Sequence, residues 1–231
     1  MQTHPTKILV ASLAAFFWAQ NAHAKTPEQR GFEVYQHVCS TCHSMDHVRF
    51  QDLHSLGISV DDIKAYAASK QIPDGLDDDG EPKTRPGKPN DVIGSPYPSP
   101  SMGRMANHGI LPPDFSRIAL THPGGAAWIE HMLQSFTTSP DKNIHVPLGA
   151  YQNTATKLGY IMMPPPLHEN GVHYTDGTKA TVPQMAQDVA AFLDATAHPH
   201  QTSRKNIGWG ILVYLAIMTL LTAVLKRRVW R

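Results

Sequence analysis

Cys39-Ser40-Thr41-Cys42-His43 is the stretch that decides the fold of this 231-residue chain. Read as C-x-x-C-H, it is the attachment signature of a c-type haem. The two thiols can each form a thioether to one porphyrin, and the histidine that follows can bind the iron. Cys39 and Cys42 are the only cysteines in the chain, so no thiol remains for a disulfide or a second metal site. The motif predicts one covalently bound haem c, with His43 as an axial ligand of its iron.

Two other kinds of site also use a C-x-x-C pair. A structural zinc site needs four ligands, commonly with a second Cys or His pair at fixed spacing. The chain has no second Cys pair, but its 14 histidines leave a Cys2His2 set open by number. A thioredoxin-like dithiol needs a βαβ context, whereas the flanks of this motif indicate helix. The adjacent histidine and the export signal described next favour haem.

The N-terminus has the three parts of a secretory signal. Lys7 precedes an apolar run from Ile8 to Trp18, and Ala22-His23-Ala24 is a small-x-small cleavage site. The apolar run is too short to span a bilayer. We therefore expect residues 1–24 to be a signal peptide and Lys25 to be the mature N-terminus; the alternative is an uncleaved N-terminal anchor.

The C-terminus differs, because Ile207 to Leu225 is a continuous apolar stretch without charge. At about 1.5 Å per residue it can cross a hydrocarbon core of about 30 Å. Trp209 and Trp230 lie near its two ends, where indoles favour the membrane interface. A basic cluster that should stay in the cytoplasm follows: Lys226, Arg227, Arg228 and Arg231. The pattern predicts a periplasmic domain at residues 25–203 and a single-pass anchor at 204–231, in the inner membrane.

The overall net charge of +1 hides an uneven distribution. All 19 acidic residues fall within residues 25–203, together with 13 of the 20 Lys and Arg, so this segment carries a net charge of −6. An acidic domain with an electron-transfer group suits a basic redox partner, because long-range attraction raises the encounter rate. A domain that is acidic only for solubility would have the same composition.

Three segments of the predicted domain begin like helices. Thr26-Pro27-Glu28-Gln29 combines a Thr N-cap, Pro at the first position and a capping-box Gln. Ser59-Val60-Asp61-Asp62 and Thr181-Val182-Pro183-Gln184 are further starts. The first helix leads to Cys39, and we expect the apolar stripe of the last helix to pack against it.

The segment between Pro73 and Arg104 is rich in Pro, Gly and Asp. We expect it to be irregular, and it is too long to be a mere connector. Asp77-Asp78-Asp79-Gly80-Glu81 within it does not fit the EF-hand spacing. A solvated loop is the first interpretation of this acidic run and partner docking the second.

A low-spin electron carrier needs a second axial ligand opposite His43, and Met on that side raises the reduction potential. Met163 is the leading candidate because Pro164-Pro165-Pro166 follows it and fixes an extended backbone. Met162 is its close competitor. Met102 and Met105 stay open as candidates in the predicted loop, whereas Met45 is too near His43 in sequence to reach the opposite face.

Taken together, these segments resemble the cytochrome c1 family, and the resemblance covers nearly the whole mature chain in order. The haem motif alone would be generic, whereas the Leu-Pro-Pro-Asp segment, the Met-x-Pro-Pro segment and the C-terminal helix together are specific. The matching segments are Val38 to Asp46, Arg85-Pro86-Gly87-Lys88, Pro96-Tyr97-Pro98, Ala106 to Gly109, Leu111 to Ser116, Met163 to Pro166 and Tyr174 to Thr178.

The resemblance implies a mostly α, class I cytochrome c-like haem domain with long loop insertions. It implies that His43 and Met163 are the axial ligands, and that Asn107, Pro112 and Pro113 line the haem pocket. Many members of this family carry an Arg just before a Gly-Gly pair, near a haem propionate. Here His122, followed by Pro123 and then Gly124-Gly125, has the corresponding place, so the chain departs from the family pattern where a propionate would be neutralised.

For function, the resemblance implies an electron-transfer subunit of the cytochrome bc1 complex with no substrate chemistry of its own. It would take electrons from the Rieske iron–sulfur protein and pass them to a cytochrome c. Cytochrome b would be a further partner, and no nucleic acid is expected to bind. Another membrane-tethered monohaem cytochrome, serving a terminal oxidase, is the nearest alternative. Two alternatives belong to other functional classes. One is a haem enzyme or gas sensor with an open axial site, and the other is a membrane-anchored dithiol oxidoreductase.

Overall fold

A computed structural model describes residues 24–230 except 138, 140 and 200. The predicted signal peptide at 1–24 therefore lies almost wholly outside the described residues. The chain divides into two compact units, the first ending at Ala197 and the second starting at His198. The first unit is mainly helical, with short 3-10 helices η1 and η2 and three two-stranded sheets, which confirms the predicted fold class.

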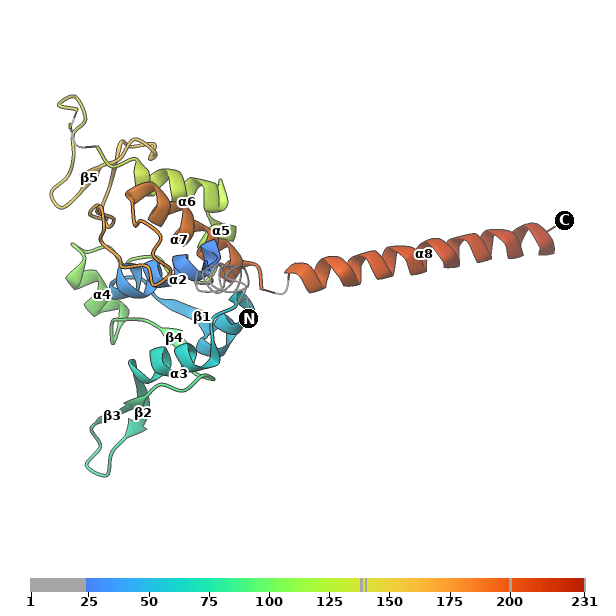
Figure 1. Ribbon diagram of the computed structural model, residues 1–231, viewed down its shortest axis with the longest axis horizontal. Coiled ribbons are helices and arrows are strands. Elements are labelled where there is room, and N and C mark those ends of the chain that lie inside the picture. Colours follow the sequence, from blue (N-terminus) through green and yellow to red (C-terminus); the bar gives the residue numbers. More distant parts are fainter. Residues whose placement is uncertain (1–23, 138, 140, 200, 231) are drawn as a thin grey trace, which may run out of the picture. The chain divides into compact units, whose positions relative to one another are not determined.

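The order of elements in the first unit follows the chain from blue to orange in Figure 1. The elements are α2 (Pro27–His37), η1 (Cys39–Thr41), β1 (Met45–Arg49), η2 (Phe50–Leu56), α3 (Val60–Ala68), β2 (Gln71–Leu76), β3 (Pro82–Pro86), β4 (Val92–Gly94), α4 (Pro100–Ala106), α5 (Ile118–Thr121), α6 (Gly125–Gln134), β5 (Tyr151–Gln152), β6 (Tyr160–Ile161) and α7 (Val182–Ala197).

All three predicted helix starts are confirmed. The Thr26 hydroxyl accepts from the Gln29 amide, and the Gln29 side chain accepts from the Thr26 amide, which completes the capping box of α2. Ser59 caps α3 by accepting from the Asp62 amide. The Thr181 hydroxyl likewise accepts from the amide of Gln184 at the start of α7.

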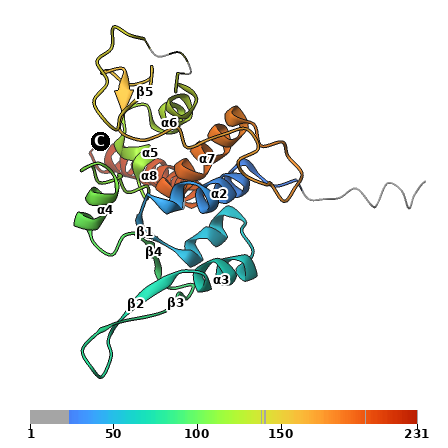
Figure 2. The same cartoon turned by 90° about the vertical axis from the view of Figure 1, so that its left-hand side faces the viewer.

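Helices α2 and α7 lie side by side at the centre of the first unit, as predicted (Figure 1 and Figure 2). The Phe192 ring of α7 lies 5.8 Å from the ring of Phe32 and 5.4 Å from that of Tyr35, both in α2. Gly31 allows the close approach, because a Cβ at this position would lie 2.0 Å from the backbone oxygen of Asp188. This crossing fixes the helix that leads to the C-x-x-C-H motif.

The prediction of an irregular segment from Pro73 to Arg104 is wrong in three places. Strands β2 and β3 form an antiparallel hairpin, β4 pairs with β1, and α4 follows. The prolines of the hairpin hid the strand pattern; a two-stranded ribbon tolerates them because each strand has an unpaired edge. The hairpin extends away from α2 and α7 (Figure 2), and its exposed tip is the acidic run at 77–81, as both the solvated-loop and the partner-docking interpretation require.

Helix α8 (Gln201–Val229) belongs to the second unit. Its segment Arg204–Val229 is long and apolar enough to cross a membrane, which confirms the predicted span. The predicted boundary between residues 203 and 204 lies inside this helix. Lys226, Arg227 and Arg228 form its basic last turn.

Candidate haem site

The C-x-x-C-H motif forms a tight turn directly after α2. Cys39 begins the short helix η1, and its carbonyl oxygen accepts from the amides of Cys42 at 3.1 Å and His43 at 2.9 Å. Cys39 is half-buried and packs against the core of the first unit. The turn therefore brings both thiols and the imidazole to the end of a helix that the α2–α7 crossing holds in place.

His43 is buried, with 8% of its surface exposed, and its ring is fixed on two sides. Nδ1 lies 2.9 Å from the carbonyl oxygen of Pro113, and the ring stacks on Phe115 with centroids 3.8 Å apart. A carbonyl can only accept, so Nδ1 carries the proton and Nε2 keeps its lone pair free. Metal-bound histidines almost always have such a partner on the second nitrogen. The structure thus holds His43 in the tautomer that an iron ligand needs.

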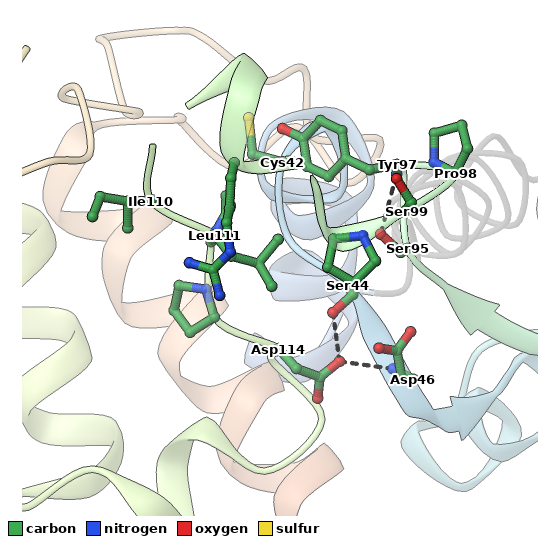
Figure 3. A pocket seen from close by; sticks show the side chains of 14 residues that line it. Cys42, Ser44, Asp46, Ser95, Tyr97, Pro98, Ser99, Ile110, Leu111 and Asp114 are labelled. Atoms are coloured by element: carbon green, nitrogen blue, oxygen red, sulfur yellow. Dashed lines mark hydrogen bonds between the residues drawn. The ribbon is translucent and has the colours of Figure 1, made fainter. Parts of the chain in front are cut away.

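A second segment clamps the residues just after His43. The carboxylate of Asp114 accepts from the Ser44 hydroxyl at 2.7 Å and from the Asp46 amide at 2.8 Å, as the dashed lines in Figure 3 show. Desolvation would raise the pKa of Asp114, but hydrogen bonds from Ser116, Asp46 and Ser44 lower it. Asp114 therefore stays ionised and ties residues 44–46 to the segment that carries Pro113.

A cavity of about 520 Å³ opens beside the motif. This volume is in the range of about 300–1,000 Å³ typical of cofactor sites. Its lining includes the apolar residues Ile110, Leu111, Pro112 and Pro113 together with Cys42 and Tyr97 (Figure 3). His43, Cys39 and Met163 are not among the lining residues, although Cys42 and Ser44 on either side of His43 are. An apolar lining beside the Cys42 thiol fits the edge of a porphyrin.

Of the three predicted pocket residues, Pro112 and Pro113 line this cavity. Asn107 does not line it but contacts Tyr97, which does. The Asn107 side-chain amide donates to the Tyr97 hydroxyl at 2.8 Å and to the Gly103 carbonyl at 2.7 Å. Asn107 thus holds the cavity-lining Tyr97 against α4. Pro113 also contributes its carbonyl to His43, a second role that its sequence position did not indicate.

The candidate methionine ligands occupy different environments. Met163 follows β6 and packs, half-buried, against the core, and Met162 is also half-buried. Met45 is fully buried in β1. Met102 and Met105 lie in helix α4, not in an irregular loop, and are 48% and 79% exposed.

Comparison with known proteins identifies the family. Residues 17–231 match the Cytochrome C1 family. Cytochrome c1 of Rhodospirillum rubrum is 40% identical over 218 residues, which are 88% of this chain and 80% of that protein. The mitochondrial cytochrome c1 heme protein of Saccharomyces cerevisiae is 35% identical over 94% of this chain and 71% of its own length. The chain belongs to the cytochrome c1 family.

A third relative is named after the complex to which it belongs. The mitochondrial cytochrome b-c1 complex catalytic subunit of Candida albicans is 36% identical over 220 residues, 94% of this chain and 76% of that protein. Family membership implies a haem cofactor, and the donor set at residues 39–43 with the adjoining cavity fits one. The confirmed family also accounts for the apolar C-terminal helix.

Two observations bear on the alternative interpretations of the C-x-x-C pair as a zinc site or as a dithiol redox site. Among residues 24–230, leaving out the three undescribed positions, no group of three or more His, Cys, Asp or Glu side chains is placed to hold a metal ion. Burial raises the pKa of the Cys39 thiol to about 12, with the neighbouring Cys42 a smaller cause. A dithiol oxidoreductase needs a lowered thiol pKa, so Cys39 is unsuited to that chemistry.

His122, which stands where many members of the cytochrome c1 family have an Arg, is not among the residues that line the described cavity. Its ring stacks on Trp128 with centroids 3.5 Å apart, and its Nδ1 lies 2.7 Å from the Pro123 carbonyl. Arg104 of α4 instead lies at the cavity. Sequence reasoning missed Arg104, although the missing Arg at position 122 was a reason to look for another cation near the motif.

Phe115 and Asp114 were also missed as site residues. Both belong to the matching segment Leu111 to Ser116, in which the resemblance assigned a role only to Pro112 and Pro113. Tyr97 belongs to the matching Pro-Tyr-Pro segment in the same way. An aromatic residue within a segment that marks the family is a signal that could have identified Tyr97 and Phe115 as cavity or ligand contacts.

Proposed function

We propose that this chain is the membrane-anchored monohaem subunit of a quinol–cytochrome c reductase, the cytochrome bc1 complex. It takes an electron from the Rieske iron–sulfur protein and passes it to a cytochrome c. It is no enzyme by itself, because the redox step belongs to its cofactor. The observation that carries the proposal is the buried His43 ring, whose Nδ1 is occupied by Pro113 next to the cavity that Cys42 borders.

The residues that would hold the haem have separate tasks. Cys39 and Cys42 would attach it covalently, and His43 would bind the iron through Nε2. Bound haem supplies a one-electron redox centre. Pro113 and Phe115 fix the orientation of the imidazole, while Leu111 and Pro112 exclude water from one side of the cavity. The polarity around a haem is one of the means by which a protein sets its potential, and here the apolar Leu111 and Pro112 face the same cavity as Asp46, Arg104 and Asp114.

For the second axial ligand we propose Met163. Its contact with the core and the three prolines that follow give the thioether a stiff support. The exposure of Met102 and Met105 and the complete burial of Met45 in β1 make them poorer choices. Met162 remains the competitor against which Met163 has to be tested.

Arg104 is the best placed of the cavity residues to neutralise haem propionates, because it is the only Lys or Arg among the residues that line the described cavity. A guanidinium pairs well with carboxylates and keeps its charge at any physiological pH. This would compensate for His122, which is engaged with Trp128.

The location follows from the two ends of the chain. A cleaved signal at residues 1–24 would export the domain, and the basic last turn of α8 would stay in the cytoplasm. The haem domain would then face the periplasm on a single-pass inner-membrane anchor. Its net charge of −6 suits a basic cytochrome c as acceptor.

Purification from native membranes through a tag on this chain tests the assignment. Cytochrome b and a Rieske protein should co-purify with it in equal amounts, and the complex should reduce cytochrome c when quinol is added. A preparation that contains terminal-oxidase subunits and lacks cytochrome b would instead support the alternative, a cytochrome that serves an oxidase.

A further inference from the structure

A charged cluster lies at the beginning of α2, away from the haem motif. Arg30 donates from Nε and Nη2 to the two carboxylate oxygens of Asp188, at 2.9 Å each, and the Asp188 side chain is completely buried. Tyr174 donates to the same carboxylate. A buried carboxylate of this kind is stable because all its partners are in place.

Lys25, the first residue after the predicted cleavage site, is held at three atoms. Its backbone nitrogen donates to Asp176 Oδ2 at 3.1 Å, its carbonyl oxygen accepts from Arg30 Nη1 at 2.6 Å, and its Nζ donates to Glu33 Oε1 at 2.7 Å. Ala24, one residue earlier, is exposed. Lys25, where cleavage would create a new end, is thus tied to the domain through its backbone and its side chain.

The cluster has one carboxylate more than it has cations. Its acids are Glu33, Asp176 and Asp188, and its cations are Arg30 and the Lys25 side chain. The side chain of Asp176 is only 2% exposed. An additional positive charge at this place would balance the three carboxylates.

Glu33 provides an independent sign that a donor is missing. This residue is 7% exposed, and its Oε2 is buried without a hydrogen-bond partner in the described part of the chain. Its Oε1 accepts from Lys25 Nζ and from the Thr175 hydroxyl. A buried unpaired carboxylate oxygen is costly, so a further N–H donor beside Lys25 would be stabilising.

We propose that the fold contains a built-in receptor for its own processed N-terminus: the new α-ammonium of Lys25 binds Asp176 and completes the acidic cluster with Glu33. A membrane-bound signal peptidase adds water across the Ala24–Lys25 peptide bond. Ala24 leaves as a carboxylate on the signal peptide, and Lys25 gains an ammonium with three N–H donors in place of one amide N–H. One donor keeps the contact with Asp176, and two become available to neighbouring acceptors.

The inference rests on the export proposed above and not on the chemistry of the haem. Cleavage would thereby change the structure of the cluster, since the ammonium adds a positive charge next to Asp176 and two N–H donors that the amide did not have. The charged and titratable groups around it are the three carboxylates, Arg30, the Lys25 side chain and Tyr174. The net attraction of the carboxylates should keep the ammonium protonated and protected from reagents.

Competitive labelling of the native, detergent-solubilised protein tests this. The purified protein is exposed to acetic anhydride at pH 7, and the fraction of chains that becomes blocked to Edman degradation is measured, because only acetylation of the α-amine blocks this reaction, whereas acetylation of the Lys25 side chain does not. Edman sequencing of the untreated protein identifies the mature N-terminus. The matched comparison is a chain with one alanine inserted between Ala24 and Lys25. Cleavage after Ala24 then leaves Lys25 with an ordinary amide and moves the ammonium one residue outward.

We expect the wild-type N-terminus to be Lys25 and to react at least about tenfold more slowly than that of the extended chain, as for one unit of pKa. Asp176→Asn should remove most of this protection. Asp78→Asn, at the exposed hairpin tip, is the charge-matched control and should leave it unchanged.

Two results would overturn the inference: a mature N-terminus other than Lys25, or equal labelling rates in the wild-type and extended chains. The extended chain keeps Asp176, so this comparison is informative even if Asp176→Asn does not fold. A haem spectrum of each sample separates failure of this inference from failure of the proposed electron-transfer role.

Discussion

The α2–α7 crossing and the haem cavity are built in opposite ways. At the crossing, Gly31 brings a helix against the backbone of Asp188, and aromatic rings fill the space around it. At the cavity, Asp114 and Pro113 join two loops by hydrogen bonds and leave a volume beside Cys42. The difference shows that the first region is complete without a cofactor, whereas the second is arranged around a group that has to be added.

The same substitution in the two regions should have very different effects. In Gly31→Ala, the new Cβ would lie 2.0 Å from a backbone oxygen that cannot move without separating the helices. Overpacking typically costs about 1–3 kcal/mol, and a contact with rigid backbone belongs at or above that range. We expect little or no folded protein, measured as haem-containing protein recovered from membranes.

Gly103→Ala is the matched variant at the cavity. Its Cβ would lie 2.7 Å from Leu111 Cδ1, the end of a flexible side chain, so the wall can shift. The higher helix propensity of Ala, about 1 kcal/mol, offsets part of the cost. This protein should fold, with an altered haem spectrum. Equal recovery of the two variants would contradict the contrast between a rigid crossing and an adaptable wall.

Asp114→Asn should have the next largest effect. The carboxylate accepts from Ser44 and from the Asp46 amide, and an amide in its place cannot keep all of these bonds. We expect a loss of about 1–3 kcal/mol in the free energy of unfolding, measured by urea denaturation. Asp61→Asn, at a side chain 94% exposed, is the control and should change little. A loss no larger than the control's would show that the two loops are held by other contacts.

The sequence was sufficient for the parts of the fold that depend on local chemistry. The caps at Thr26, Ser59 and Thr181 and the apolar segment of α8 follow from neighbouring residues alone. The C-x-x-C-H motif likewise located the two predicted attachment cysteines and the first predicted axial ligand, His43. These features could be predicted because the residues that determine them are close together in the chain.

What could not be predicted depends on pairs far apart in sequence. The contact of His43 with Pro113 joins residues 70 positions apart, and no local pattern indicates which carbonyl approaches the ring. The pairing of β1 with β4, in which Met45 lies opposite Gly94, organises a segment that reads as loop. Prolines obscured the strand alternation there.

Arg104→Gln tests the charge at the cavity. Loss of a positive charge near the haem should favour the oxidised form and lower the reduction potential by roughly 40 mV, which corresponds to about 1 kcal/mol, the size of a charge–charge interaction across a partly solvated cavity. Spectroelectrochemical titration measures the shift, with exposed Lys64→Gln as control. A potential within the control's range would remove Arg104 from the haem environment.

The smallest effect is expected at the base of the exposed hairpin. Hydrogen bonds from Arg85 and the Lys88 amide lower the pKa of Asp91. A lowered folded-state pKa means that the stabilisation is present above the unfolded value, about 3.9, and is lost as the pH falls below it. Thermal unfolding between pH 6 and pH 3 should show a slightly steeper acid loss in the wild type than in Arg85→Gln. Identical acid profiles would contradict this.

The axial ligands are the most direct test of a cavity built for haem. Met163→Leu and Met162→Leu make the same change at adjacent half-buried positions, and the near-infrared spectrum of the oxidised protein reports the sulfur-to-iron charge-transfer band. Met163→Leu should lose this band and lower the potential, while Met162→Leu keeps it. Loss of the band in Met162→Leu alone would contradict the assignment, and binding of carbon monoxide to the reduced wild type would contradict a six-coordinate electron carrier.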